Sequence, residues 1–310
     1  MHFEQFTQAH ERLRPYLPST PMELAPTLGE NVWLKLENAN KTHSFKSRGA
    51  LNAILALPDD VRARGVVTAS TGNHAQGIAY AAQLLGVRAC IVMPNYAARR
   101  KVNGVRRLGA EAILHGDTYD AAEIEAHRLE REQGMTYISP YNHPDVIAGA
   151  GTVGLEIYDA LPSIERVIVP VGGGGLISGV GMVLKTLKPT VEVIGVNPLV
   201  SPDMYNIFYQ LEHPLGYETL ADALPGAIEL NSITLEMTQR YVDRIVLASE
   251  ESIAHAMRWM VFEQGWIAEG GGVVGVAVLQ SGTIEPGGTT VVVITGGNVD
   301  GDVLRRVLEL

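Results

Sequence analysis

The run of four glycines from Gly172 to Gly175 is the strongest chemical signal in the sequence. It follows the β-branched stretch RVIVPV and precedes LISGVGMVLKTLK, which has helical periodicity. Glycines at such a junction let the backbone approach an anion closely, and the free N–H groups and the dipole of the helix attract that anion. A tight structural turn would explain an isolated pair of glycines, but four in a row favour a phosphate site.

Common nucleotide motifs do not match this loop. In a dinucleotide fingerprint that starts at Gly172 and Gly174, the third glycine position is occupied by Ile177, and the next strand ends without an acid for the ribose. The sequence also lacks the GxxxxGK(S/T), HExxH and GxSxG motifs. The loop therefore indicates a phosphate compound of another kind.

Lys46 is the second candidate, in the segment KTHSFKSRGALNAILAL, at or just before the start of an amphipathic helix. A lysine amine forms Schiff bases when desolvation or a neighbouring cation lowers its pKa, and Arg48 is a candidate for that cation. Most lysines beside a helix start are simply solvated. This segment therefore needs support from the rest of the chain.

The segment TASTGNHAQ brings short polar residues to the opening of a helix, directly after the run GVVTAS. These residues are Ser70, Thr71, Gly72, Asn73 and His74. Exposed N–H groups at a helix start suit a carboxylate, although Ser, Thr and Asn are also ordinary N-caps. His74 taken alone is more often a structural residue than a general base.

Thr295 stands where the run TTVVVIT leaves its expected sheet, and Gly296, Gly297 and Asn298 follow it. Ligands of open α/β sheets bind at that edge, although a lone motif of this kind is also an ordinary turn. Glu269, in AEGGGVVG, has two interpretations: a functional acid, or an acidic residue that caps the following helix.

Eight short β-branched runs alternate with stretches of helical period, which predicts an α/β fold with mostly parallel, twisted sheets flanked by helices. The runs are VWLKLE, GVVTAS, ACIVMP, AEAILH, RVIVPV, VEVIGV, RIVLAS and TTVVVIT. One expected helix is GNHAQGIAYAAQLLG, and another is SEESIAHAMRWMVFEQG, with Ser249 as N-cap and Gly265 as C-cap. We expect two domains: a large one formed by residues 1–64 and 142–310, and a small inserted one formed by residues 65–141.

Composition and charge limit the possible functions. The formal net charge of −10 over 310 residues argues against a nucleic-acid surface. Cys90 is the only cysteine and lies in an apolar stretch, so we expect a buried, inert thiol. Residues 167–184 carry no charge, but their glycines and Pro170 favour strand, loop and helix over a membrane span. The N-terminus lacks the features of a signal peptide, so we place the protein in the cytoplasm.

Taken together and in this order, the four segments resemble the fold-type II family of pyridoxal-phosphate enzymes, especially the threonine and serine dehydratases and serine racemase. SFKSRGA resembles the cofactor-lysine motif of that family, STGNHAQ its substrate-carboxylate loop, GGGGL its phosphate loop and TGGN its C-terminal element. The likeness spans nearly the whole chain. It implies a fold similar to the tryptophan synthase β-subunit, with pyridoxal 5'-phosphate as the cofactor.

The resemblance implies a role for each matching residue. Lys46 would hold the cofactor aldehyde as a Schiff base and later remove the α-proton of the substrate. The cofactor would contact Phe45 at its ring, Asn73 at its phenolic oxygen, Thr295 at its ring nitrogen, and Gly172, Gly173, Gly174, Gly175 and Leu176 at its phosphate. Ser70, Thr71, Gly72, Asn73 and His74 would surround the substrate carboxylate.

Thr295 bears on the type of reaction, because a neutral hydroxyl does not enforce protonation of the ring nitrogen as a carboxylate would. This moderates the electron sink and favours prompt loss of the β-hydroxyl. The expected activity is a dehydratase, or ammonia-lyase, that converts a β-hydroxy amino acid of the threonine or serine type to a 2-oxo acid and ammonia. We expect a small amino-acid substrate, a homodimer or higher homo-oligomer, and neither a nucleic acid nor a membrane as partner.

Several alternatives stay open at this stage. A racemase needs a second acid or base on the opposite face of the α-carbon, and Thr71 is the candidate. A threonine synthase-like enzyme and a β-replacement enzyme share the same motifs. A sensor of amino acids or of the cofactor would retain the pocket without turnover.

Some positions depart from the family pattern. His43 stands where relatives usually have Gly, Thr71 where Ser or Ala is common, and Thr295 where dehydratases more typically have Ser or Cys. Asn197 replaces a Glu of the metal-binding members, although Asp222 matches their ADG-like segment. No metal ligand is therefore assigned.

Overall fold

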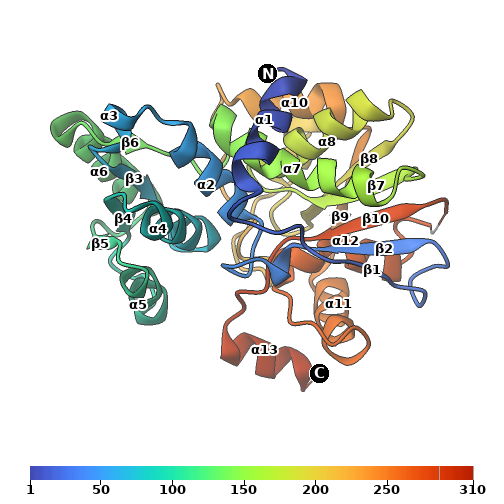
Figure 1. The fold of residues 1–310 in the computed structure, drawn as a ribbon. Helices are drawn as coiled ribbons and strands as arrows, with labels where there is room; N and C mark the ends of the chain where they lie inside the picture. The colour runs from blue at the N-terminus through green and yellow to red at the C-terminus, as the bar shows by residue number, and fades with distance from the viewer. Residues whose placement is uncertain (286, 310) are drawn as a thin grey trace.

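The computed structural model describes residues 1–285 and 287–309 and contains two β-sheets, each covered by helices (Figure 1). The larger sheet has the strand order β1-β2-β10-β7-β8-β9, and the smaller has the order β5-β4-β3-β6. Neighbouring strands are parallel except β1 and β2. The strands are Met22–Leu24 (β1), Val32–Leu36 (β2), Val66–Ala69 (β3), Ala89–Met93 (β4), Glu111–Leu114 (β5), Thr136–Tyr137 (β6), Arg166–Pro170 (β7), Glu192–Pro198 (β8), Arg244–Ala248 (β9) and Thr290–Ile294 (β10).

Helices fill the stretches between the strands. They are Phe3–Leu13 (α1), Lys46–Ala56 (α2), Asp59–Arg62 (α3), Asn73–Leu85 (α4), Arg99–Arg107 (α5), Tyr119–Gln133 (α6), Pro144–Ala160 (α7), Gly175–Leu187 (α8), Asp203–Tyr209 (α9), Ile233–Tyr241 (α10), Glu250–Phe262 (α11), Gly270–Gln280 (α12) and Gly301–Leu308 (α13), with a 3-10 turn at Glu37–Ala39 (η1).

The large sheet lies between two helical layers (Figure 1). On one side, α12 packs along β7, β8, β9 and β10, and α11 and α13 lie outside it. On the other side, α8 packs on β7, and α7, α1 and α10 surround α8. Strands covered on both faces have no polar side, which explains why every residue of β10 is buried and why its sequence, TVVVI, does not alternate.

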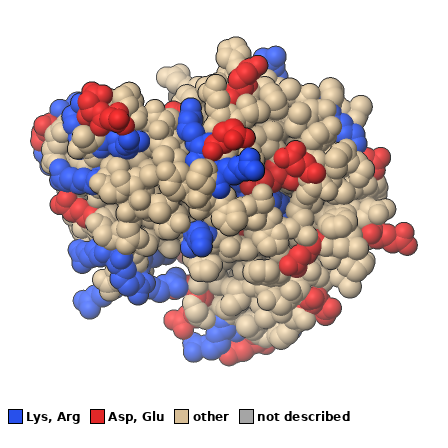
Figure 2. Space-filling view, in the orientation of Figure 1, with Lys and Arg blue, Asp and Glu red and all other residues tan. Residues whose placement is uncertain are grey.

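The small sheet is covered by α6 against β3, β4 and β6, and by α4 and α5 against β3, β4 and β5. Helix α5 carries five basic residues in nine, and Lys and Arg side chains gather at this end of the molecule (Figure 2). The protein as a whole is acidic, so this basic end is a local feature.

The eight runs expected to be strands are all strands, and the prediction of mostly parallel sheets is confirmed. Two short strands were not expected. β1 has three residues and β6 has two, too few to show a periodic pattern. Ser249 caps α11 as expected, because its side chain accepts the N–H of Ser252, but the expected C-cap at Gly265 is wrong, since the helix ends at Phe262 with Glu263 as its cap. Gly265 instead takes a positive φ of 69° just beyond the helix end.

The division into domains at residues 65 and 141 stays a prediction. The four strands of the small sheet lie between Val66 and Tyr137, inside the range assigned to the small domain. Helix α2 lies before that range, yet its buried residues pack with those of α4 and β4 in one apolar cluster. Residues 286 and 310, which fall in the range assigned to the large domain, lie outside the described residues.

The uncharged stretch 167–184 forms β7, the glycine loop and most of α8, as the sequence predicts. Across the described ranges 1–285 and 287–309, no helix combines the length and the apolar character needed to cross a membrane. Cys90 is fully buried on β4, so the prediction of a buried thiol is confirmed, and burial raises its pKa to about 11, which favours the unreactive protonated form.

Candidate active site

Lys46 is the first residue of α2, and glycines on two neighbouring helices fix where this helix starts. A Cβ at Gly77 of α4 would lie 3.0 Å from the carbonyl oxygen of Lys46, and one at Gly149 of α7 would lie 2.5 Å from that of Arg48. A larger residue at either position would displace α2. The backbone from which the Lys46 side chain extends is therefore closely confined.

Lys46 is partly buried, and its amine is bound by the backbone. Its Nζ donates to the carbonyl oxygen of Pro140 at 2.7 Å and lies 5.1 Å from the centre of the Phe45 ring. Burial lowers the pKa of Lys46 to about 8, against the opposing effect of the negative charge of Glu269. An amine with this pKa is available in its neutral, nucleophilic form at mildly alkaline pH.

Arg48 does not act on Lys46 as a neighbouring cation, so that expectation from the sequence is wrong. Its buried guanidinium donates through Nε to Glu37 at 2.8 Å and through Nη1 to Glu156 at 2.6 Å. The amine of Lys35 lies 2.6 Å from the same Glu156. The charge of Arg48 is neutralised within this cluster, and burial of the lysine itself lowers the pKa of Lys46.

The four glycines connect β7 to α8. Gly174 is the N-cap of α8 and has a φ of 85°, a conformation that disfavours residues with a side chain. The hydroxyl of Thr234 donates to the carbonyl oxygen of Gly173 at 2.8 Å and holds the loop from behind. In the described part of the chain, the N–H groups of Gly172, Gly173 and Gly174 have no acceptor. These groups and the start of the helix form an anion site.

Tyr141 joins the glycine loop to the amine of Lys46. A Cβ at Gly173 would lie 2.4 Å from Cγ of the Tyr141 ring, so the ring packs directly on the loop. Tyr141 follows Pro140, which accepts the hydrogen bond from Lys46 Nζ. Pro140 and Tyr141 therefore connect the amine of Lys46 with the glycine loop. No pattern in the sequence assigned Pro140 or Tyr141 to the site.

Residues 70–74 open α4 and leave room for a ligand. Gly72 is the N-cap, and a Cβ placed on it would meet nothing within 4 Å. Its N–H donates to the hydroxyl of Ser70 at 3.3 Å. Ser70, Thr71, Gly72 and Asn73 are all partly buried. The start of α4 thus faces open space with its polar side chains around it.

His74 lies just behind this opening and is buried. Its Nε2 lies 3.0 Å from the carbonyl oxygen of Ile138 and must donate to it, so in the neutral ring Nδ1 is an acceptor. Nδ1 has no partner among the described residues. Burial, together with the positive charge of Lys46, lowers the pKa of His74 to about 3, so the ring is neutral near pH 7.

Thr295 follows β10 and lies beside the residues that precede Lys46. Its carbonyl oxygen accepts the N–H of Phe45 at 3.1 Å, and Gly296 forms an isolated bridge with Ser44. The side chain of Thr295 is buried, and its hydroxyl bonds to no described residue. The structure therefore brings the C-terminal TGGN element and the SFK segment together.

Asn73, Asn298 and Glu269 form a connected group of side chains. Asn298 Nδ2 donates to Asn73 Oδ1 at 2.8 Å, and Asn73 Nδ2 donates to Glu269 Oε1 at 2.6 Å. Glu269 is the N-cap residue of α12, but its side chain makes no capping bond to that helix. Burial and the charge of Asp222 raise the pKa of Glu269 to about 7. Glu269 therefore occupies the N-cap position that the helix-cap interpretation predicts, but its carboxylate is bound to Asn73 and makes no capping bond.

The positions that depart from the family pattern have structural explanations. His43 is exposed and has a φ of 54°, a conformation that glycine adopts more easily. Asn197 is buried and fully engaged: it donates to the carbonyl oxygen of Val171 at 2.7 Å and accepts the N–H of Tyr205 at 2.9 Å. Within residues 1–285 and 287–309, no three His, Cys, Asp or Glu side chains are grouped so as to hold a metal ion.

These observations fit pyridoxal 5'-phosphate. The N–H groups of the glycine loop suit its phosphate, the amine of Lys46 suits its aldehyde, and the hydroxyl of Thr295 is free to face its ring nitrogen. Phe45 packs against the apolar cluster that contains Leu176, the residue after the loop. The four segments singled out in the sequence therefore surround one place, where a phosphate, an aldehyde and a ring have complementary groups.

The comparisons with known proteins agree with this geometry. The sequence model of the pyridoxal-phosphate dependent enzyme family matches residues 13–296. An L-threonine ammonia-lyase of Thermotoga maritima is 42% identical over 99% of this chain and 78% of its own. The processed form of threonine deaminase isoform 2 from Solanum lycopersicum matches with a TM-score of 0.91 and 34% identity, over 99% of this chain and 87% of its own. Maize serine racemase matches with a TM-score of 0.91 and 30% identity, over 99% and 96% of the two chains.

Proposed function

The chain belongs to the family of pyridoxal-phosphate dependent enzymes, and from that premise we propose that it is a threonine or serine ammonia-lyase. It converts a small β-hydroxy amino acid to a 2-oxo acid and ammonia. One observation carries the proposal: the amine of Lys46 meets, at the Pro140–Tyr141 pair, the glycine loop that suits a phosphate. The identity of 42% to a threonine ammonia-lyase supports this choice of reaction.

The cofactor, when bound, supplies the electron sink that makes the α-proton of the amino acid acidic. The residues of the chain bind, orient and move protons around it. Lys46 takes the α-proton on Nζ, and the lowered pKa of about 8 keeps a fraction of this amine neutral and able to do so. Gly172 to Gly175 would hold the phosphate through backbone N–H groups, next to Leu176.

Asn73 and Thr295 set the electronics of the ring from two sides. Asn73 would donate to the phenolic oxygen of the bound cofactor, and Thr295 would offer a neutral hydroxyl to its ring nitrogen. A hydroxyl does not force that nitrogen to carry a proton, so the bound cofactor would be a moderate electron sink. This favours elimination over long survival of a carbanion.

The open start of α4 receives the substrate carboxylate. Ser70, Thr71 and Gly72 offer hydroxyls and backbone N–H groups around free space at Gly72. His74, as a neutral ring with Nδ1 as acceptor, suits a donor such as an ammonium or hydroxyl group better than a carboxylate. We assign it to the wall of the substrate site.

A panel of amino acids tests this function. Purified, cofactor-loaded protein is incubated with L-threonine, L-serine, a hydroxyaspartate and a bulkier β-hydroxy amino acid. We expect stoichiometric 2-oxo acid and ammonia from at least one of the first two. Turnover of none of them by a cofactor-loaded protein would contradict the proposal and favour a sensor.

Racemisation is the second candidate, because maize serine racemase matches as closely in structure as the threonine deaminase does. It would require Thr71 to exchange a proton on the face of the α-carbon opposite to Lys46. Chiral analysis of the same incubations separates the two reactions. D-amino acid that accumulates without 2-oxo acid would show racemisation, and 2-oxo acid shows elimination.

The compartment and the assembly state of the enzyme are also part of the proposal. We propose a cytoplasmic enzyme that assembles as a homodimer or higher homo-oligomer, with residues 65–141 as its small domain. The buried Cys90 suits a reducing compartment. Light scattering at several protein concentrations checks the assembly.

A further inference from the structure

We propose that Glu269 is a positioning residue for this reaction, which acts by fixing the orientation of the Asn73 side-chain amide toward the cofactor. The inference rests on the proposed function and concerns the interaction between Asn73 and the phenolic oxygen. The sequence allowed two interpretations of Glu269, a functional acid or a helix cap, and the geometry favours the positioning role.

The orientation of an Asn amide is decided by what its two ends must bind. Asn298 is fixed first, because its Nδ2 donates at 2.8 Å to the carbonyl oxygen of Thr42, which can only accept. The second N–H of the same group donates at 2.8 Å to Asn73 Oδ1. This places the oxygen of Asn73 toward Asn298 and its NH2 group on the other side.

Glu269 fixes the other end of Asn73. Its Oε1 accepts from Asn73 Nδ2 at 2.6 Å, a short distance typical of a charge-assisted hydrogen bond. Both ends of the chain of amides are thus held by acceptors, the carbonyl oxygen of Thr42 and, above its raised pKa of about 7, the ionised carboxylate of Glu269. One N–H of Asn73 remains, and it is the one available to the phenolic oxygen of the cofactor.

The backbone at Gly296 allows the carboxylate of Glu269 to lie close to Asn73. A Cβ at Gly296 would lie 2.4 Å from Glu269 Oε1 and 3.1 Å from Asn73 Nδ2, so only glycine allows the approach. The N–H of Glu269 donates to the carbonyl oxygen of Gly296 at 3.0 Å. Glu269 is 4% exposed, and its side chain makes no bond to the helix that it precedes. A residue needed only as a helix cap would be oriented toward α12.

Burial of the negative charge of Glu269 is energetically unfavourable, which indicates that this position serves the reaction. Burial and the neighbouring Asp222 disfavour the ionised form, and the hydrogen bonds from Asn73 and from the backbone N–H of Asn298 oppose this effect. The same negative charge favours the protonated form of Lys46. Glu269 therefore acts on both side chains that the proposed function places at the reacting end of the cofactor.

Glu269→Gln is the direct test, because it keeps the size of the side chain and removes the charge. The Gln amide can also donate, so it no longer dictates which end of Asn73 faces it. We expect a shifted absorbance maximum of the bound cofactor and a kcat/KM lower by about 100-fold, the scale of a misplaced reacting group. Glu218→Gln is the matched control, since Glu218 lines the same cavity of about 420 Å3 as Glu269 but is exposed and does not contact Asn73.

A double-mutant cycle tests whether Glu269 acts through Asn73. In an Asn73→Ala background, Glu269→Gln should lower kcat/KM by less than about 3-fold further, because the group that it positions is already gone. Effects of the two substitutions that multiply would overturn the inference. So would an absorbance spectrum of Glu269→Gln that is the same as that of the wild-type protein.

Glu269→Asp covers the case in which the Gln variant does not hold the cofactor. It keeps the charge but withdraws the carboxylate from Asn73, and we expect it to show the same direction of spectral change. A wild-type spectrum and wild-type kcat/KM in the Asp variant would contradict the positioning role. Formation of 2-oxo acid by the wild-type protein is measured separately, so a failure of the proposed function is distinguished from a failure of this inference.

Discussion

The amine of Lys46 donates a hydrogen bond of 2.7 Å to the carbonyl oxygen of Pro140, the residue before the tyrosine that packs on Gly173. This contact spans 94 positions of the chain and links the start of α2 with the segment between β6 and α7. An amine donates this bond in its neutral or its ammonium form, but the same nitrogen must become free to form a Schiff base with the cofactor aldehyde. Release of this bond is therefore part of loading the cofactor.

Substitution of Lys46 by Ala should abolish turnover and remove the absorbance of the lysine-bound cofactor, because no other amine occupies this position. Lys41→Ala provides the control: Lys41 is exposed and five positions away, and its removal should leave both properties unchanged. A spectrophotometric scan of the two purified variants is sufficient. An unchanged spectrum in the Lys46 variant would show that the cofactor is bound through another residue.

The rate at which the apoprotein takes up the cofactor should rise with pH, with a midpoint near pH 8, and level off above about pH 9. Only the neutral amine attacks an aldehyde, and burial lowers the pKa of Lys46 from its ordinary value near 10.5 to about 8. A solvated lysine would show the rise near pH 10 instead. Stopped-flow absorbance between pH 6.5 and 10 measures the midpoint, and a rate that still climbs steeply above pH 9.5 would rule out a desolvated amine.

The parts of the site that the sequence predicts are those that lie within one strand-to-helix junction. The tetraglycine loop, the opening of α4 and the end of β10 each combine a β-branched run with polar or glycine residues, so local pattern alone places them at the edge of a sheet. Lys46 was placed correctly at a helix start for the same reason.

Contacts between distant segments were not predictable in this way. Glu269 and Asn73 are 196 positions apart, and neither segment contains a signal that names the other. Arg48 is a second residue whose contacts could not be predicted from its local sequence. From its spacing it was expected to lower the pKa of Lys46, but its guanidinium is bound by Glu37 and by Glu156, 108 positions away. Only the packing of α2 against α7 decides which way the side chain points.

Replacement of Glu156 by Ala should destabilise the protein by about 3–5 kcal/mol, because it leaves the buried charges of Arg48 and Lys35 without their shared partner. The carboxylate of Glu156 is 5% exposed, and these two cations lower its pKa against the effect of burial. Urea unfolding followed by circular dichroism measures the loss. Asp302→Ala removes an ion-pair partner that is 93% exposed and should change the free energy of unfolding by less than about 1 kcal/mol. Equal effects of the two substitutions would show that the buried cluster is not a stabilising unit.

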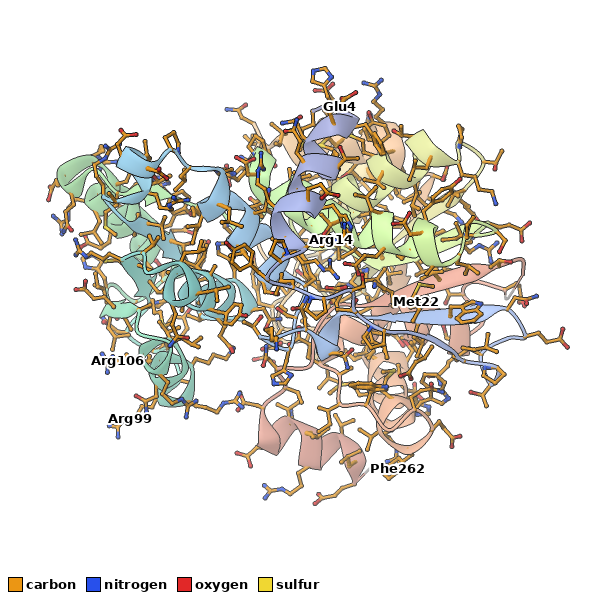
Figure 3. All side chains as sticks on the ribbon, in the orientation of Figure 1. Glu4, Arg14, Met22, Arg99, Arg106 and Phe262 are labelled. Atoms are coloured by element: carbon orange, nitrogen blue, oxygen red, sulfur yellow. The ribbon has the colours of Figure 1, made fainter. Side chains whose placement is uncertain are left out.

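Arg100 and Asp300 join the basic helix α5 to the start of α13, with Nη2 and Oδ1 2.8 Å apart. Both side chains are about half exposed, so a double-mutant cycle on unfolding should give a coupling free energy of about 0.2–1 kcal/mol that weakens with added salt. Arg106→Ala is the control, because this side chain lies on the exposed side of the same helix (Figure 3). A coupling that is insensitive to salt would mean that the pair is shielded from water.

His74 should make the protein sensitive to acid. Burial lowers its pKa in the folded state to about 3, whereas the unfolded chain binds the proton near pH 6.5. Between these values the unfolded state holds more protons, so this contribution to stability is present above pH 6.5 and falls as the pH drops, by about 1.4 kcal/mol per unit. His74→Gln should flatten the pH dependence of the free energy of unfolding between pH 6 and 4, while loss of the exposed His213 serves as the control for removing an imidazole. If the slopes of the wild-type and His74→Gln proteins are equal, the ring takes up its proton equally well in the folded and unfolded states, and burial does not lower its pKa.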